Sequence, residues 1–160
     1  SNYVLASPTT TTTAAITPKT LTLAGLAAAD KVYDGNTAAT VTGSLAGLVA
    51  GESLGLVLDG RFDTKDAGSG KTVTVGTALG DGAGGRAANY RLDPSATTTA
   101  AITPRALTVT ADDASKVYGT TLTFAGTEFT SSGLVEGERI DRVTLTSAGA
   151  APSASVAGGP

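Results

Sequence analysis

The sequence predicts an all-β protein built from antiparallel sandwiches in tandem, arranged as an elongated rod. Three observations support this fold class. Short alternating stretches such as residues 72–75 are separated by glycine-containing turns, at the spacing of about 8–12 residues that sandwiches show. Thr and Val, which favour strands, are abundant, and no segment has a capped helical period. Several motifs also recur at one spacing, which indicates repeated units.

Four motifs agree on the length of the repeat. The recurrences are Lys31-Val32-Tyr33 at residues 116–118 (116 − 31 = 85), residues 14–18 at 100–104 (100 − 14 = 86), Asn2-Tyr3 at residues 89–90 (89 − 2 = 87), and residues 48–52 at 134–138 (134 − 48 = 86). A period of about 86 residues is the size of a small domain. The pattern therefore predicts tandem domains rather than one large domain.

The period divides the chain into three predicted parts. Residues 1–18 are expected to be the closing strands of a preceding repeat, 19–104 a complete sandwich and 105–160 an incomplete one. Thr-Pro joints separate the parts, at Pro18 and Pro104. Proline restricts its own backbone and that of the preceding residue, so each joint is expected to be short and stiff.

Alternation and β-branched residues predict the strands in chain order. The expected strands are the Thr-rich residues 9–13, then 21–23, 37–42, 54–58, 72–75, 89–92, the Thr-rich 96–102, 107–109 and 143–145. Glycine-containing segments predict the turns between them, at residues 34–36, 50–52, 59–60, 68–70 and 80–85. The incomplete last part is expected to leave an open sheet edge that another strand could complete.

Aromatic residues are scarce, at 4% of the chain, and all four tyrosines fall in the recurring motifs. Large aromatic side chains dominate the packing of small cores. We therefore expect Tyr33, Tyr90 and Tyr118 to be structural anchors in the cores of their repeats.

Composition argues against several classes of function. The net charge of −3, with both signs interspersed, is unlike a nucleic-acid-binding face. No apolar run reaches the length needed to span a membrane, so membrane insertion is not expected. The chain has no His and no Cys, which excludes the usual triads, cysteine nucleophiles and zinc sites. We expect no enzymatic activity and no organic cofactor.

Two further chemistries are open. Asp59, Asp63 and Asp66 are candidate calcium ligands, because calcium prefers clustered carboxylate oxygens. Lys31 is a candidate for an isopeptide bond to an Asn or Asp, if its amine is buried. The alternative for Lys31 is a surface lysine whose aliphatic stem covers the neighbouring tyrosine.

The motifs resemble known bacterial repeats. Lys31 to Ala38, with the letters KVYDGNTA, is similar to the signature of the YDG repeat, and residues 62–75 and 89–104 resemble its middle and end. Residues 115–119, which lack the Asp, resemble the MBG repeat, a mostly bacterial immunoglobulin-like module. The resemblance implies immunoglobulin-like sandwiches in secreted or outer-membrane-associated proteins of Gram-negative bacteria, many similar to filamentous haemagglutinin-type adhesins.

These observations favour a structural stalk, in which repeats pack against their neighbours in the same chain and hold a distal binding region away from the cell. One alternative is a module that binds a glycan, a host or cell-surface protein, or calcium through residues 80–85. Another is a filament unit that polymerises by strand exchange. The expected location is the surface of a Gram-negative bacterium, or secreted from it.

Overall fold

The computed structural model describes residues 2–3, 9 and 11–156, and within them the chain divides into two compact units. Unit 1 comprises the described residues up to Asp30 together with Thr37–Thr64 and Ser69–Ala101. Unit 2 comprises Lys31–Asn36, Lys65–Gly68 and the described residues from Ile102 onward. Three short segments of the first predicted sandwich, residues 31–36, 65–68 and 102–104, therefore belong to the second unit.

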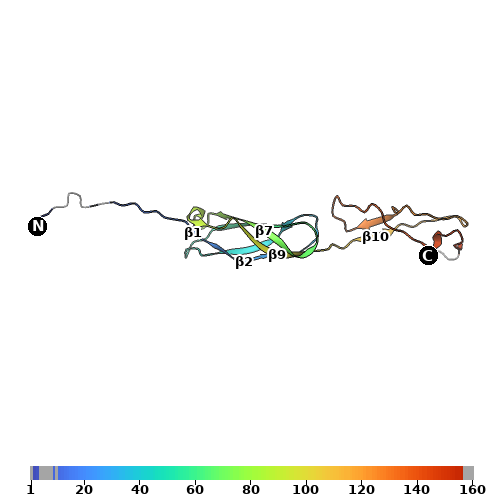
Figure 1. Cartoon of the computed structure of the whole chain (residues 1–160), viewed down its shortest axis with the longest axis horizontal. Coiled ribbons are helices and arrows are strands. Elements are labelled where there is room, and N and C mark those ends of the chain that lie inside the picture. Colours follow the sequence, from blue (N-terminus) through green and yellow to red (C-terminus); the bar gives the residue numbers. More distant parts are fainter. Residues whose placement is uncertain (1, 4–8, 10, 157–160) are drawn as a thin grey trace. The chain divides into compact units, whose positions relative to one another are not determined.

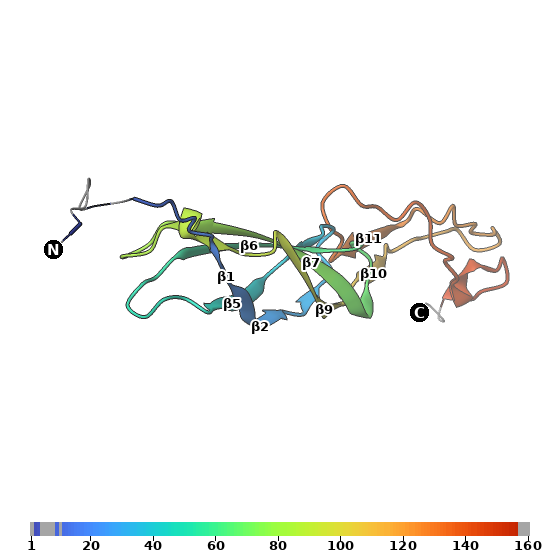
Figure 2. The same cartoon turned by 60° about the vertical axis from the view of Figure 1, so that its left-hand side comes forward.

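The largest sheet has the strand order β3-β9-β7-β6-β4. Its strands are β3 (Lys31–Val32), β4 (Ala38–Ala39), β6 (Gly55–Phe62), β7 (Gly68–Gly80) and β9 (Ser95–Thr103). The antiparallel β6–β7 pair is its longest ladder, running from Gly55↔Gly80 to Phe62↔Val73 (Figure 2). At the edge, β3 pairs with β9 in parallel.

A second sheet in unit 1 pairs β2 (Thr22–Ala28) with β5 (Val41–Ala46) in antiparallel register. The register shifts between Ala24 and Ala27, where Gly25 has a φ of +62° that glycine adopts readily. Gly43 of β5 approaches Leu58 of β6, so this sheet forms a layer against the larger one (Figure 1). The chain enters unit 1 through β1 (Lys19–Thr20), which pairs in parallel with β8 (Tyr90–Arg91).

The core of unit 1 follows the period of two that strands impose. On β7, Val73 and Val75 are fully buried, whereas Thr72 and Thr74, which alternate with them, are exposed. The buried apolar side chains of the described structure are Leu21, Phe62, Val73, Val75, Tyr90, Ala100 and Ile102.

Residues 104–156 of unit 2 contain less regular structure. The strands β10 (Thr108–Ala111) and β11 (Phe129–Ser132) form an antiparallel pair, and a short 3-10 helix, η2, spans Ala148–Ala150. Phe124 and Phe129 are half-buried. Among the described residues after Ile102, no apolar side chain is fully buried.

The all-β prediction is confirmed, and most predicted strands of residues 21–104 correspond to observed ones. Two predicted turns are wrong, since residues 59–60 lie inside β6 and 68–70 begin β7. A Cβ on Gly60 would lie 2.5 Å from Val41 Cγ1 and 2.9 Å from the Ala39 carbonyl oxygen. This glycine therefore allows close packing against β4 of its own sheet and β5 of the other sheet, rather than forming a turn.

Two other predicted strands do not form. Residues 143–145 are irregular, and so are the described residues 9 and 11–13 of the first Thr-rich segment; Thr10 lies outside the described residues. Strands require partners for their backbone groups. The equivalent Thr-rich segment forms β9 because β3 and β7 flank it. The boundaries at residues 1–18, 19–104 and 105–160 stay a prediction.

Candidate functional site

The recurring tripeptide that ends at Tyr33 opens a tight turn over Lys31–Asn36, here called the Tyr33 turn. The Lys31 Nζ donates to Asp34 Oδ1 at 2.7 Å and to the Asn36 carbonyl at 2.9 Å. Asp34 Oδ1 also accepts from the Asn36 N–H at 3.1 Å, and Gly35 has a φ of +79°. The adjacent ammonium group of Lys31 lowers the pKa of Asp34. These contacts fix the turn that presents Tyr33.

Tyr33 is held at both ends. Its N–H donates to the Thr103 carbonyl of β9 at 2.8 Å, and its hydroxyl donates to Glu138 Oε1. Lys65 Nζ lies 3.7 Å from the same carboxylate oxygen. The hydrogen bond to Glu138 raises the pKa of Tyr33, and Tyr33 followed by Glu138 raises the pKa of Lys65. All of these groups belong to unit 2.

The segment that receives Tyr33 is a second tight turn, residues 134–138, here called the Glu138 turn. The Glu138 N–H donates to the Val135 carbonyl at 3.0 Å, and Gly137 has a φ of +86°. Val135 lies against the Tyr33 turn so closely that a Cβ on Gly35 would be 2.8 Å from Val135 Cγ1. A pocket of about 300 Å³ remains between these segments, lined also by Pro104, Arg105 and Leu107.

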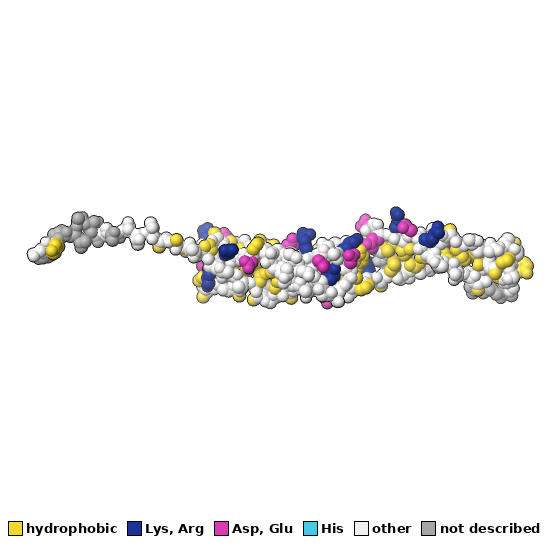
Figure 3. Space-filling model, viewed as in Figure 1, with side chains coloured by type: hydrophobic (Ala, Val, Ile, Leu, Met, Phe, Trp, Pro, Cys, Tyr) yellow, Lys and Arg dark blue, Asp and Glu magenta, His cyan; other side chains and the backbone are white. Residues whose placement is uncertain are grey.

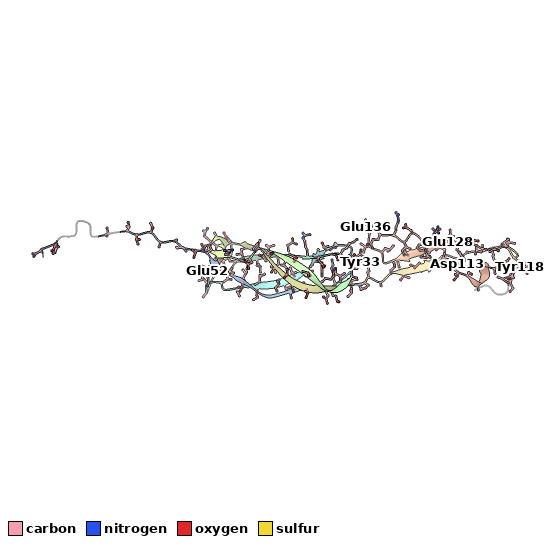
Figure 4. The ribbon with its side chains drawn as sticks, viewed as in Figure 1. Tyr33, Glu52, Asp113, Tyr118, Glu128 and Glu136 are labelled. Carbon is pink, nitrogen blue, oxygen red and sulfur yellow. The ribbon has the colours of Figure 1, made fainter. Side chains whose placement is uncertain are left out.

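Unit 1 contains a turn of the same geometry at residues 48–52, here called the Glu52 turn. The Glu52 N–H donates to the Val49 carbonyl at 3.1 Å, and Gly51 has a φ of +86°. Its carboxylate accepts from the Tyr90 hydroxyl at 2.5 Å, which raises the pKa of Tyr90. A pocket of about 320 Å³ adjoins this turn, lined also by Pro18 and Lys19. Glu52 and Tyr33 are marked in Figure 4.

The three predicted tyrosine anchors have different environments. Tyr90 is buried, with 6% of its surface exposed, whereas Tyr33 is half-buried in the pocket of the Glu138 turn. Tyr118 is 67% exposed and is therefore not a core residue, in contrast to the prediction. It lies in a turn closed by the Thr120 N–H and the Val117 carbonyl, which directs it to solvent (Figure 4).

The candidate calcium ligands lie in separate environments. Asp59 pairs with Arg61 at 3.3 Å, Asp63 pairs with Lys71 at 3.0 Å, and Asp66 lines the pocket beside Tyr33. Within the described residues, no group of three or more acidic side chains is placed to hold a metal ion. Acidic and basic side chains are interspersed on the face seen in Figure 3.

Lys31 lies beside the two side chains with which it could form an isopeptide bond. In addition to Asp34, its amine contacts Asn36 Oδ1 at 3.0 Å. The amine is engaged in a hydrogen-bonded ion pair with Asp34, and 17% of the Lys31 side chain is exposed. The isopeptide bond stays a prediction.

The glycine-rich residues 80–85, considered above as a binding loop, are tied to residue 53. Ser53 N–H donates to the Ala83 carbonyl at 3.0 Å, and the Ala83 N–H donates to Ser53 Oγ at 3.1 Å. Asp81 Oδ1 accepts from the Ala87 N–H at 2.8 Å. The polar groups of this loop are thus used internally.

Sequence reasoning did not assign a role to Glu52 or Glu138. The signal was present, since residues 48–52 recur at 134–138 with Leu, Val, Gly and Glu retained. Spacing alone does not reveal that the glutamate accepts a hydrogen bond from a tyrosine hydroxyl, because the tyrosine is distant in sequence. The structure supplies that pairing in both units.

Comparison with known families assigns both regions. A model described as the YDG domain matches residues 17–100, and one described as the MBG domain (YGX type) matches residues 107–159. No curated protein and no solved structure matches the chain. In the part that the structure describes, no helix has the length and apolarity to cross a membrane.

Proposed function

Because the chain belongs to the YDG domain family and continues into an MBG domain, we propose that it is a stalk segment of a large adhesin on the surface of a Gram-negative bacterium. YDG and MBG domains are repeat modules of bacterial surface proteins. The role proposed for this chain is mechanical: it transmits load and separates a distal binding region from the cell. The proposal includes no catalytic step.

The observation that carries the proposal is the way the chain enters and leaves the YDG region. Entry strand β1 pairs in parallel with β8, with Lys19 opposite Tyr90, and the Leu21 N–H extends the pairing to the Arg91 carbonyl at 2.7 Å. Exit strand β9 pairs in parallel with β3, with Ile102 opposite Lys31. The entry strand β1 and the exit strand β9 are thus each hydrogen-bonded to a strand that runs parallel to them.

Parallel pairing at the ends has a mechanical consequence. Tension along the chain pulls β1 toward its amino end and pulls β8, which leads into β9, toward its carboxyl end. The two strands must slide past each other, so their hydrogen bonds are loaded together rather than one at a time. Such a shear arrangement suits a module that carries tension.

Single-molecule force spectroscopy tests this proposal. The full chain, pulled from its two ends, is expected to give a discrete unfolding peak for the YDG region. As a matched control, handles at Val57→Cys and Ala78→Cys pull on residues that are paired across β6 and β7. These handles separate the ladder bond by bond and are expected to unfold the sheet at lower force.

Two outcomes would contradict the stalk. One is an end-to-end unfolding force no higher than that of the β6–β7 control. The other is specific binding of the isolated chain to glycans or host proteins on an array, abolished by changes in residues 80–85. The chain has no cysteine, so the handles can be attached without competing thiols.

A further inference from the structure

The two pockets next to the Glu52 and Glu138 turns are built from equivalent residues. Val49 and Val135, Glu52 and Glu138, and Pro18 and Pro104 each differ by 86 positions (135 − 49, 138 − 52 and 104 − 18). The turn hydrogen bonds and the positive φ of the turn glycine are also the same in both. We call each pocket, with its turn and its proline, a socket.

Both socket glutamates accept from a tyrosine hydroxyl, but only one socket is covered by a Lys-Val-Tyr turn. We call the covered socket filled and the other, which holds Tyr90 alone, open. In unit 2, the Tyr33 turn occupies the socket: its phenol bonds to Glu138 and its Gly35 packs on Val135. In unit 1, Val49 is 48% exposed, and no equivalent turn covers it within the described residues. Glu52 uses Oε2 for Tyr90. Its Oε1 has no hydrogen-bond partner among the described groups.

The chain also carries an unused copy of the turn that fills a socket. Lys116-Val117-Tyr118 repeats Lys31-Val32-Tyr33. A glycine of positive φ also follows, Gly119 at +88°, although it comes directly after the tyrosine and Gly35 comes two residues after Tyr33. Val117 and Tyr118 are 75% and 67% exposed. Two large apolar side chains displayed together in this way are typical of a contact surface.

We propose that the Glu52 socket binds the Tyr118 turn of a second copy of this chain. The Tyr118 hydroxyl donates to Glu52 Oε1, beside Tyr90 on Oε2, as Tyr33 donates to Glu138. Gly119, one residue nearer to its tyrosine than Gly35 is, packs on Val49. The inference deepens the proposed function, because it names the contact by which stalk repeats join end to end. The inference rests on the proposed stalk function only for its biological setting, because the match between the Glu52 socket and the Tyr118 turn is a property of the chain itself.

The contact joins different surfaces of the two partners, so it is heterologous and does not close on itself. Association therefore produces open head-to-tail oligomers. A single turn in a small pocket buries much less than the roughly 1,200 Å² of a stable interface, so the affinity is expected to be low. Within a tandem protein the same contact is strengthened by the high effective concentration of linked repeats.

Analytical ultracentrifugation of the full chain tests the proposal. The average mass of the wild type is expected to rise with concentration up to roughly 1 mM. Tyr118→Ala removes the turn's anchor, and Val49→Asp places a charge in the socket. Each is expected to weaken self-association at least about tenfold. Val57→Asp, at another exposed valine that lines neither pocket, is the matched control and should associate like the wild type.

Mixing the two variants separates loss of a surface from loss of the fold. The Tyr118→Ala chain retains its socket and the Val49→Asp chain retains its turn, so an equimolar mixture should form a one-to-one dimer and nothing larger. A wild type that stays monomeric, or a mixture that does not dimerise, overturns the proposal. Neither result changes the force experiment, so failure of this contact is distinguishable from failure of the stalk.

Discussion

The regions 19–103 and 104–156 differ in their interiors but share the devices at their ends. The first has a five-stranded sheet and all seven of the buried apolar side chains that the structure describes. The second has the β10–β11 pair and half-buried phenylalanines. Both nevertheless have a Pro-containing joint, a socket turn with its glutamate, and a Lys-Val-Tyr turn. The joint, the socket turn and the Lys-Val-Tyr turn therefore recur in both regions, although the two interiors differ in strands and in burial.

The largest expected effect comes from truncating a core phenylalanine in each region. Phe62 is 3% exposed, and Phe62→Ala is expected to lower the free energy of unfolding by about 3–5 kcal/mol. Phe129 is only half-buried, so Phe129→Ala should cost about 1 kcal/mol. Urea denaturation of each full-length variant measures both. Equal losses would contradict the difference between the two interiors.

A methyl group tests the packing between the sheets of the first region. Gly60→Ala would place its Cβ 2.5 Å from Val41 Cγ1, and we expect it to cost about 1–3 kcal/mol of stability through overpacking. The matched control is Gly76→Ala in the neighbouring strand, where the new Cβ would lie 3.8 Å from its nearest atom. If thermal unfolding shows the two variants to be equally stable, Gly60 is not required for close packing.

The filled and open sockets can be compared through their tyrosines. Glu138 raises the pKa of Tyr33 and Glu52 raises the pKa of Tyr90 above the ordinary value of 10.0. A raised folded-state pKa means that the stabilisation is complete below pH 10.0 and is lost as the pH rises through the folded pKa. Alkaline unfolding of the wild type should therefore begin above pH 10.0.

Tyrosine ring NMR signals followed with pH assign the effect to its partner. Glu138→Gln should lower the pKa of Tyr33 and leave that of Tyr90 unchanged. Glu52→Gln should lower the pKa of Tyr90 and leave that of Tyr33 unchanged. A shift of both tyrosines in either variant would show that the sockets are coupled, contrary to this description.

The smallest expected effects concern two carboxylates with lowered pKa values. Lys71 lowers the pKa of Asp63, whereas backbone N–H groups, first that of Ala125, lower the pKa of Glu128. A carboxylate whose pKa is lowered in the folded state stabilises the fold when the pH is above its ordinary pKa, which is 3.8 for Asp63 and 4.5 for Glu128. This stabilisation is lost as the pH falls through the pKa of the folded state. Salt screens the charge of Lys71 but acts less on hydrogen bonds from backbone N–H groups. Added salt should therefore reduce the pKa shift of Asp63 more than that of Glu128.

Carboxyl NMR titrations at low and high salt measure this difference. Lys71→Gln should bring the pKa of Asp63 toward its ordinary value without affecting Glu128. Equal salt sensitivity of the two groups would mean that Lys71 is not the cause of the Asp63 shift.

Alternation and recurrence were sufficient to predict much of the first region. Val73 and Val75 alternate with threonines, so the strand and its buried face could be read from the sequence. Gly60 was misread because Asp-Gly is a common turn signal, and only the approach of Val41 explains its place in a strand. Local sequence does not encode such distant packing.

The site was predictable only in part for a similar reason. Tyr33 and Tyr118 occur in identical tripeptides, yet one is packed against Glu138 and the other is exposed. The sequence indicates that both turns matter, but burial depends on whether a socket is present to receive them. The recurrence of residues 48–52 at 134–138 is the signal that identifies those sockets.

Disulfide trapping tests most directly whether the two sockets are the same device. In the filled socket, a Cβ on Gly35 would lie 3.7 Å from Val135 Cβ, within the roughly 3.5–4.5 Å that a disulfide requires. The double variant Gly35→Cys/Val135→Cys should therefore cross-link within one chain. A mixture of Val49→Cys and Gly119→Cys chains is predicted to form a mixed dimer faster than Val57→Cys with Gly119→Cys. Equal rates for the two mixtures would contradict the account.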